Sequence, residues 1–210
     1  MKDKLLTILA QAWSILLYPL WMPTVGMALY CYGYSHIVLP LQPMYTWIGI
    51  GTTFFMTAFI PLTIIVVGVS RGQINDVYIK EASQRTMPYL YSLICYAVWS
   101  YFLWHVMHVA PFFLAAAIGA TVCLGMVTAI NLKWKISSHL SGLGGLIGGI
   151  LAFYCFYHMV PSFTLIGGLL LIALLLMYAR LYLNAHDELQ VVSGFLLGLC
   201  STFLPSLLVC

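Results

Sequence analysis

The sequence contains little charge. Charged residues make up 6% of its 210 residues, whereas hydrophobic residues make up 63%. A soluble domain carries about 25% charged residues and is about half apolar. A chain this apolar cannot hide its hydrophobic surface from water by folding on itself, so lipid must be its solvent. The scarcity of charge therefore excludes an ordinary soluble protein, and we expect the lipid bilayer, and no nucleic acid, as a partner.

Other features are absent as well. The six cysteines form no C-x-x-C pair and lie scattered through apolar runs, so we expect no disulfide and no zinc site. The first apolar run continues into further spans and has no convincing signal-peptide cleavage site. The apolar runs are continuous, whereas the strands of a membrane β-barrel alternate in short segments. What remains is a helical membrane protein, which we expect to form one domain over residues 1–210.

Long apolar runs predict the membrane spans, because a spanning helix needs roughly 20 apolar residues. Such runs lie at about 11–34, 46–69, 88–108, 111–131, 140–160, 162–183 and 191–209. Pro19 and Pro23 predict that the first run is kinked or partly interfacial. Pro111 and Pro161 are expected to start helices after tight links. We therefore expect an all-α, polytopic transmembrane bundle of six to seven helices.

The few charges are unevenly distributed between these spans. All eight Lys and Arg and all five Asp and Glu lie at the N-terminus or in the connectors at about 70–87, 132–139 and 180–190. The alternate connectors, at about 35–45, 109–111 and 160–162, carry no formal charge. Positive residues favour the cytoplasmic side of a membrane. We therefore expect a multi-pass protein of a bacterial inner membrane with its charged face in the cytoplasm.

Three polar segments meet at this charged face, and an apolar helix follows each of them. They read KEASQRTMP (80–88), KISSHL (135–140) and ARLYLNAHDELQ (179–190). Together they supply basic, imidazole and hydroxyl groups, at Lys80, Arg85, Lys135, Arg180, His139, His186, Ser137 and Ser138. Arginine forks bind phosphate through several hydrogen bonds, and histidine can act as a nucleophile or a proton donor near neutral pH. The segments therefore predict phosphoryl transfer or hydrolysis at the boundary between lipid and water.

In order, spacing and membrane placement, the three segments resemble the type-2 phosphatidic acid phosphatase (PAP2) superfamily. The family signature is Lys-x6-Arg-Pro, then Pro-Ser-Gly-His, then Ser-Arg-x5-His-x3-Asp. In the third segment, Arg180 and His186 are separated by five residues, as the family requires. The second segment keeps Ser137 and His139 in register, although isoleucine replaces the proline and serine replaces the glycine.

The first segment matches the family less closely. Lys80 and Pro88 have the family's spacing, but the arginine, Arg85, stands two places early. The resemblance covers about residues 70–200, and as a set the three segments are more specific than any one of them.

The resemblance implies a helical-bundle core and a reaction that needs neither a metal nor a cofactor. By that analogy, His186 attacks the phosphorus and forms a phosphohistidine, and His139 protonates the leaving alcohol. The residues implied to hold the phosphate oxygens are Lys80, Arg85, Ser137 and Arg180. The implied substrate is a phosphorylated membrane lipid, such as phosphatidic acid, phosphatidylglycerol phosphate, a polyprenyl diphosphate or a lipid A phosphate.

Gln190 departs from the family pattern, because it stands where the family has an aspartate four residues after the nucleophilic histidine. One helical turn from His186, Gln190 can orient the ring by accepting a hydrogen bond, but it cannot neutralise an imidazolium. A comparable Asp-to-Asn change in a serine protease triad costs around 10⁴-fold in rate. The alternative is a weakened homologue that binds or translocates a phosphorylated lipid without hydrolysis. A small transporter is disfavoured, since the spans hold no acidic residue for ion coupling.

Single residues have simpler interpretations. Arg180 alone is consistent with snorkelling to the head groups, and His186 alone with an interfacial polar residue. The glycines of SGLGGLIGG (141–149) favour close helix packing over a phosphate loop, since the Gly-Lys-Ser/Thr ending is missing. Three further histidines lie near the uncharged face without a third ligand or carboxylate, so we expect no metal site there; they are His105, His108 and His158.

Overall fold

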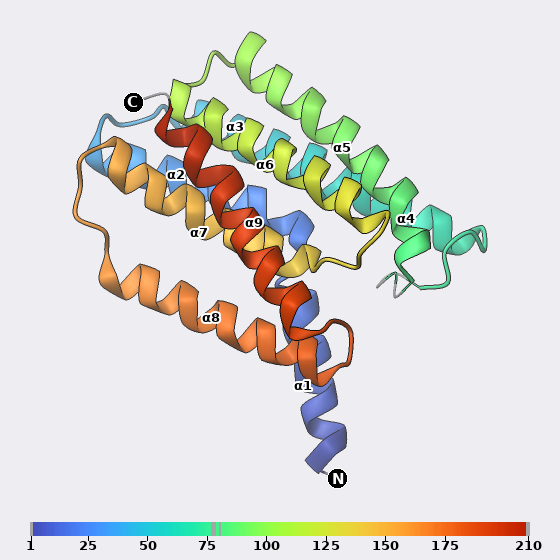
Figure 1. Cartoon of the computed structure of the whole chain (residues 1–210). Helices are drawn as coiled ribbons and strands as arrows, with labels where there is room; N and C mark the ends of the chain where they lie inside the picture. Colours follow the sequence, from blue (N-terminus) through green and yellow to red (C-terminus); the bar gives the residue numbers. More distant parts are fainter. Residues whose placement is uncertain (1, 77–78, 80, 209–210) are drawn as a thin grey trace.

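The computed structural model describes residues 2–76, 79 and 81–208 (Figure 1). Helices joined by short loops make up this part of the chain, and it contains no strand. The helices are α1 (Lys2–Leu16), α2 (Met22–Ile37), α3 (Pro43–Phe54), α4 (Ile60–Ser70), α5 (Ala82–His105), α6 (Pro111–Asn131), α7 (Ser138–Phe156), α8 (Phe163–Tyr182) and α9 (Glu188–Leu207). A short 3-10 helix, Pro19–Trp21, precedes α2, and a π-helical turn, Phe55–Phe59, joins α3 to α4. Within the described residues, six helical segments are long and apolar enough to cross a membrane. The predicted all-α polytopic bundle is confirmed.

The connecting loops alternate between two ends of the bundle. The loops after α4, α6 and α8 lie at one end, which we call the charged end; their described residues are 71–76, 79, 81, 132–137 and 183–187. The loops at 38–42, 106–110 and 157–162 contain no formal charge and lie at the other, uncharged end. Tyr45 ties two elements of the uncharged end together, because its hydroxyl donates a hydrogen bond to the Met107 carbonyl oxygen (3.0 Å).

The first apolar run is broken where the prolines stand. Helix α1 ends at Leu16, Pro19 starts the 3-10 helix, and Pro23 lies in the first turn of α2. Proline lacks the N–H that an uninterrupted helix would use and sterically opposes the preceding turn. The run Lys4–Ile37 has 34 residues, and as one straight helix it would measure about 51 Å, well beyond a hydrocarbon core of about 30 Å. The predicted kink is therefore present, and it divides the run into two helices.

The starts of α6 and α8 show one prediction that holds and one that does not. Pro111 is the first residue of α6, as predicted. Pro161 does not start α8, which begins at Phe163. Ser162 is the N-cap instead, because its hydroxyl accepts a hydrogen bond from the backbone N–H of Leu165 (3.3 Å). The start of α8 is therefore set by the hydroxyl of Ser162, which accepts a hydrogen bond from an otherwise unpaired N–H of the first turn, and not by the proline before it.

Helices α7 and α9 pack more extensively against each other than any other pair, and glycines make this possible (Figure 1). A Cβ atom at Gly144 would collide with the carbonyl oxygen of Phe195, and one at Gly148 with that of Leu199. From the opposite side, a Cβ atom at Gly198 would collide with the backbone of α7. The predicted role of the glycine run in close helix packing is confirmed, and its partner is α9.

The α7–α9 pair is parallel, which brings two of the polar segments together. Contacts run in step along both helices, from Ser137 against Gly194 to Ser141 against Gly198. Both helices therefore begin at the charged end. The backbone N–H of Ser137 also donates to the carbonyl oxygen of Gln190 (3.2 Å). The segments 135–140 and 179–190 are thus adjacent because two helix starts are held side by side.

Candidate functional site

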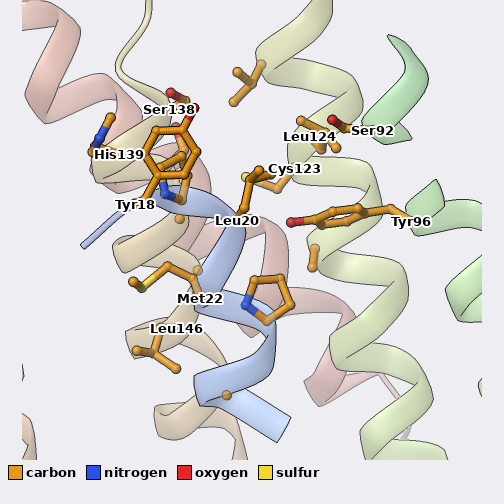
Figure 2. Close-up of a pocket in the computed structure, with 18 of the residues that line it drawn as sticks. Tyr18, Leu20, Met22, Ser92, Tyr96, Cys123, Leu124, Ser138, His139 and Leu146 are labelled. Atoms are coloured by element: carbon orange, nitrogen blue, oxygen red, sulfur yellow. The ribbon is translucent and has the colours of Figure 1, made fainter. Parts of the chain in front are cut away.

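A cavity lies inside the charged half of the bundle, between the break before α2 and helices α5, α6 and α7 (Figure 2). Its volume is about 130 Å³, whereas one water molecule needs roughly 10–15 Å³ of such space. Most of its lining is apolar. Its polar lining includes Tyr18, Arg85, Tyr89, Ser92, Ser138, His139, Ser141 and Arg180, with Tyr30, Tyr96, Trp99 and Thr202 deeper in the bundle. The structure thus brings Arg85, His139 and Arg180 to one cavity.

Both arginines are buried in protein. Arg85 is 4% exposed and Arg180 is 6% exposed, so snorkelling of Arg180 to exposed head groups is wrong. Arg85 Nε donates to the carbonyl oxygen of Ile79 (2.7 Å). Arg85 Nη1 and Arg180 Nε are buried and have no hydrogen-bond partner among the described residues. Burying charged donors without acceptors is costly, and donors of this kind suit an anion with several oxygens, such as phosphate.

His186 lies in the loop before α9 and is 8% exposed. Its Nδ1 is 3.0 Å from Gln190 Oε1 and 3.1 Å from the carbonyl oxygen of Lys135. From their spacing in the sequence, His186 and Gln190 are predicted to lie one turn apart on a helix. In the structure, His186 lies outside the helix, just before the N-cap Asp187. The contact forms because the side chain of Gln190, in the first turn of α9, points back toward the residues that precede the helix.

The capping box of α9 determines the tautomer of His186. Gln190 N–H donates to Asp187 Oδ1 (2.9 Å), and the backbone N–H of Asp187 donates to the side-chain amide of Gln190 (3.4 Å). An N–H can only be accepted by the amide oxygen, so the atom facing His186 is Oε1 and not the NH₂ group. Nδ1 therefore carries the proton that these two oxygens accept, and Nε2 keeps its lone pair.

The surrounding charge keeps the His186 ring neutral. Burial, followed by the guanidinium groups of Arg180 and Arg85, lowers the pKa of His186 to about 4, against the opposing effect of the Gln190 and Lys135 oxygens. Burial, then Arg85 and Arg180, also lower the pKa of Lys135. At neutral pH, His186 is an uncharged imidazole in a positive electrostatic field. Such a ring is a nucleophile and not an acid.

His139 lies in the first turn of α7 and is 7% exposed. Its Nε2 is 3.2 Å from the carbonyl oxygen of Ser14, which can only accept, so Nε2 carries a proton. The ring of Tyr18 meets it edge-on, with the ring centroids 5.5 Å apart. His139 also lies within electrostatic reach of Arg180 and His186. Both histidines thus have one ring nitrogen engaged by a carbonyl oxygen, which leaves the other nitrogen of each ring for chemistry.

The remaining predicted residues are placed differently. Ser137 is fully buried, and its hydroxyl caps α7 by accepting from Leu140 N–H (3.5 Å). Ser138, not Ser137, lines the cavity. A serine directly before a helical run is a common N-cap, and this was the available signal that its hydroxyl is committed to the backbone. Lys80 lies outside the described residues.

The sequence did not identify Tyr18 or Tyr89 as residues of the site. Both line the cavity. Tyr18 directly precedes Pro19, and the helix break there turns its ring toward His139. A helix break next to an aromatic residue was the signal in the sequence, but the partner of Tyr18 is more than a hundred residues away. His186 itself is not among the residues that line the cavity and lies beside it.

In residues 2–76, 79 and 81–208, no group of three or more His, Cys, Asp or Glu residues could hold a metal ion. The cysteines at 31, 95, 123, 155 and 200 are free thiols. Comparisons with protein-family models, with curated proteins and with solved structures gave no match to this chain.

Proposed function

We propose that this membrane protein is a phosphatase of lipid mono- or diphosphates, related in its chemistry to the PAP2 superfamily. One observation carries the proposal. His186 is a neutral imidazole whose Nδ1–H is held by two oxygens, and two buried arginines with unsatisfied N–H groups lie within electrostatic reach of it. This combination provides a nitrogen nucleophile next to donors for phosphate oxygens.

The proposed reaction has two steps. In the first, the lone pair of His186 Nε2 forms a bond to the terminal phosphorus while the bond from that phosphorus to the leaving oxygen breaks; this oxygen belongs to the lipid alcohol in a monophosphate and to the inner phosphate in a diphosphate. The leaving oxygen takes a proton from His139. In the second, water attacks the phosphohistidine, the phosphorus–nitrogen bond breaks, and one proton of the water returns to His139. Inorganic phosphate and the dephosphorylated lipid leave, so atoms and protons balance.

The arginines bind the phosphate in this scheme. Their unsatisfied N–H groups would bind the phosphate oxygens and stabilise the negative charge of the transition state. Because Nε2 of His139 is engaged by the carbonyl oxygen of Ser14, its Nδ1 would carry the proton that the leaving oxygen takes.

The second candidate function is binding of a phosphorylated lipid without hydrolysis, and the contact to Gln190 favours it. Attack by Nε2 leaves a positive charge on the His186 ring. Here the ring is supported by two neutral carbonyl oxygens, at Gln190 and Lys135, and by no carboxylate among the described residues. Neutral dipoles stabilise that charge less than an ionised carboxylate would. The two candidates therefore share one site and differ in rate.

The test uses the purified protein in detergent with phosphatidic acid, phosphatidylglycerol phosphate, a polyprenyl diphosphate and a lipid A phosphate, and measures free phosphate without added metal. We expect release from at least one lipid, and a loss of about 10³-fold or more in His186→Ala and His139→Ala. His105→Ala, an exposed histidine of the uncharged end, is the matched control and should leave the rate unchanged.

Unchanged release in His186→Ala would exclude the proposed nucleophile. Binding without release, converted into release by Gln190→Asp, would establish the second candidate. We also propose that the charged end faces the cytoplasm, because the described loops at this end carry Lys and Arg residues and those at the other end carry none. In cells that express the protein, a membrane-impermeant maleimide should then label Lys133→Cys more strongly than the wild type, which carries exposed cysteines of its own, in inverted vesicles and not in intact cells. Additional labelling of the variant in intact cells would reverse the orientation.

A further inference from the structure

The cavity that contains the arginines continues into an apolar interior. Figure 2 shows Tyr18, Ser138 and His139 together at one end, with Met22 and Leu146 toward the other. The lining there includes small residues of three helices, at Gly26 of α2, at Ala116, Ala117 and Ala120 of α6, and at Gly145 of α7, beside larger apolar side chains. One continuous space therefore joins a cationic end to an apolar interior.

Two bulky side chains stand where this space stops. Phe113 and Met27 are 6% and 5% exposed, and both line the cavity. Both also line a second cavity at the uncharged end, together with Tyr34, Leu41, Tyr45, Met107 and His108. Tyr30 and Tyr34 hold Phe113 in place through edge-on ring contacts, with centroid separations of 6.4 Å and 5.7 Å. Phe113 and Met27 therefore form a partition between two cavities.

We propose that the apolar part of the first cavity holds a hydrocarbon chain of the phosphorylated lipid, and that Phe113 and Met27 limit the length of chain accepted. This inference rests on the proposed function, since the phosphate end of the lipid is placed at Arg85 and Arg180. The cationic end and the apolar interior are continuous, which favours a lipid chain as the occupant. A phosphate held by the two guanidinium groups has its chain attached at the mouth of the apolar space that opens from them.

The selection is steric. A hydrocarbon chain that leaves the bilayer for an apolar protein cavity exchanges one apolar environment for another, so burial adds little affinity. A chain that reaches the partition, however, meets closely packed aromatic side chains that cannot shift without loss of packing. Short chains fit, and chains that extend past Phe113 are excluded.

The experiment measures binding and hydrolysis on the same series of alkyl phosphates, of increasing length and with bromine at the chain end. Trp99 lines the cavity, is 3% exposed, and is fixed by a hydrogen bond from its Nε1 to Thr53 Oγ1 (3.0 Å). Bromine that enters the cavity should quench Trp99 fluorescence, and the quenching should disappear in Trp99→Phe. For the wild-type protein, we expect both quenching and phosphate release to fall sharply beyond one chain length.

Phe113→Ala opens the partition, and we expect it to move this limit to longer chains by several methylene groups. Phe112→Ala is the matched control, because Phe112 precedes it on α6, is fully buried, and lines neither cavity. A second variant, Ala117→Leu, fills the cavity instead and should move the limit to shorter chains. The two variants change the limit in opposite directions, so general destabilisation cannot imitate the result.

The outcomes for the chain and for the phosphatase are separable. Length-dependent quenching without phosphate release would support the chain cavity and contradict the proposed hydrolysis. Phosphate release that is equal for all lengths and unaffected by Phe113→Ala would overturn the chain cavity and leave the hydrolysis intact. Absence of quenching at every length would also overturn the chain cavity.

Discussion

The two ends of the bundle both contain histidines, but in opposite environments. At the charged end, His139 and His186 are buried and each donates a ring N–H to a carbonyl oxygen. At the uncharged end, the histidines are exposed; they are His36, His105, His108 and His158. Two of them lie against neighbouring aromatic rings, at 4.3 Å from Tyr32 and from Trp104. A histidine acquires a defined tautomer from buried carbonyl oxygens, and only the charged end supplies them here.

The difference between the two ends arises from packing as well as from charge. The glycine contacts of α7 and α9 hold two helix starts together at the charged end, and the loops before them enclose His186. At the uncharged end, the histidines belong to loops and to the last turns of α2 and α5. The backbone does not bury these side chains, since all four histidines are exposed.

The largest effect should come from separating the two helix starts. Gly198→Leu forces a side chain into the backbone of α7 at Ser141 and Gly145. We expect a loss of about 3 kcal/mol or more in the free energy of unfolding, a lower Tm and loss of phosphate release. Gly167→Leu is the control, because a Cβ atom at Gly167 of α8 meets nothing within 4 Å. Equal Tm values for the two variants would show that close packing of α7 and α9 does not maintain the charged end.

A smaller effect should come from removing one buried cation. Arg180→Gln keeps a polar side chain but removes the charge from the cavity, and hydrogen bonds to charged groups contribute about 1.5–3 kcal/mol. We expect about 10- to 100-fold weaker binding of a short alkyl phosphate, measured by calorimetry. The control is Arg71→Gln, since Arg71 is an exposed cation of the same end. If both variants weaken binding equally, the phosphate is attracted by the net charge of the surface and not by the cavity.

The smallest effect concerns proton binding by His186. Its pKa is lowered from 6.5 to about 4 in the folded protein, so the unfolded chain binds more protons between these values. Stability should therefore be complete above pH 6.5 and fall as the pH decreases toward 4. Gln190→Asp places a negative charge beside Nδ1 and raises this pKa, so the loss of Tm between pH 7 and pH 4.5 should be smaller than in the wild type.

The matched control for that substitution is Gln73→Asp, which adds the same charge at an exposed position of the charged end. Its Tm should follow the wild-type dependence on pH. A direct measurement is available from the imidazole resonances in NMR, where the ring of His186 should stay neutral at pH 6. A ring that titrates near pH 6.5 would contradict the buried, positively surrounded environment.

Much of the architecture could be predicted from local features of the sequence. The apolar runs gave the helices, Pro19 and Pro23 gave the break in the first run, and the glycines at 141–149 gave the tight helix contact. Each of these depends on a property of one residue or one short window: hydropathy, a missing N–H or a missing Cβ. The start of α8 was predicted wrongly at Pro161, because the capping hydroxyl of Ser162 was not weighed against the proline.

The site was less predictable, because its contacts join distant segments. The motif spacing indicated Arg85, His139 and Arg180, which do share a cavity. Spacing alone could not show that the Ser137 hydroxyl is used as a helix cap while Ser138 faces the cavity. It also could not find Tyr18, whose ring reaches His139 across 121 positions of the chain.

The sequence by itself determined that this protein lies in lipid, that its spans are helical, and that its charges gather toward one side, because hydropathy and charge accumulate residue by residue. Only the tertiary structure decided which nitrogen of His186 keeps a lone pair and where the apolar space beyond the arginines stops. Both depend on carbonyl oxygens and ring faces from segments far apart in the chain. Their meeting is determined by the packing of α7 on α9 and of α6 on its neighbours, which no local pattern encodes.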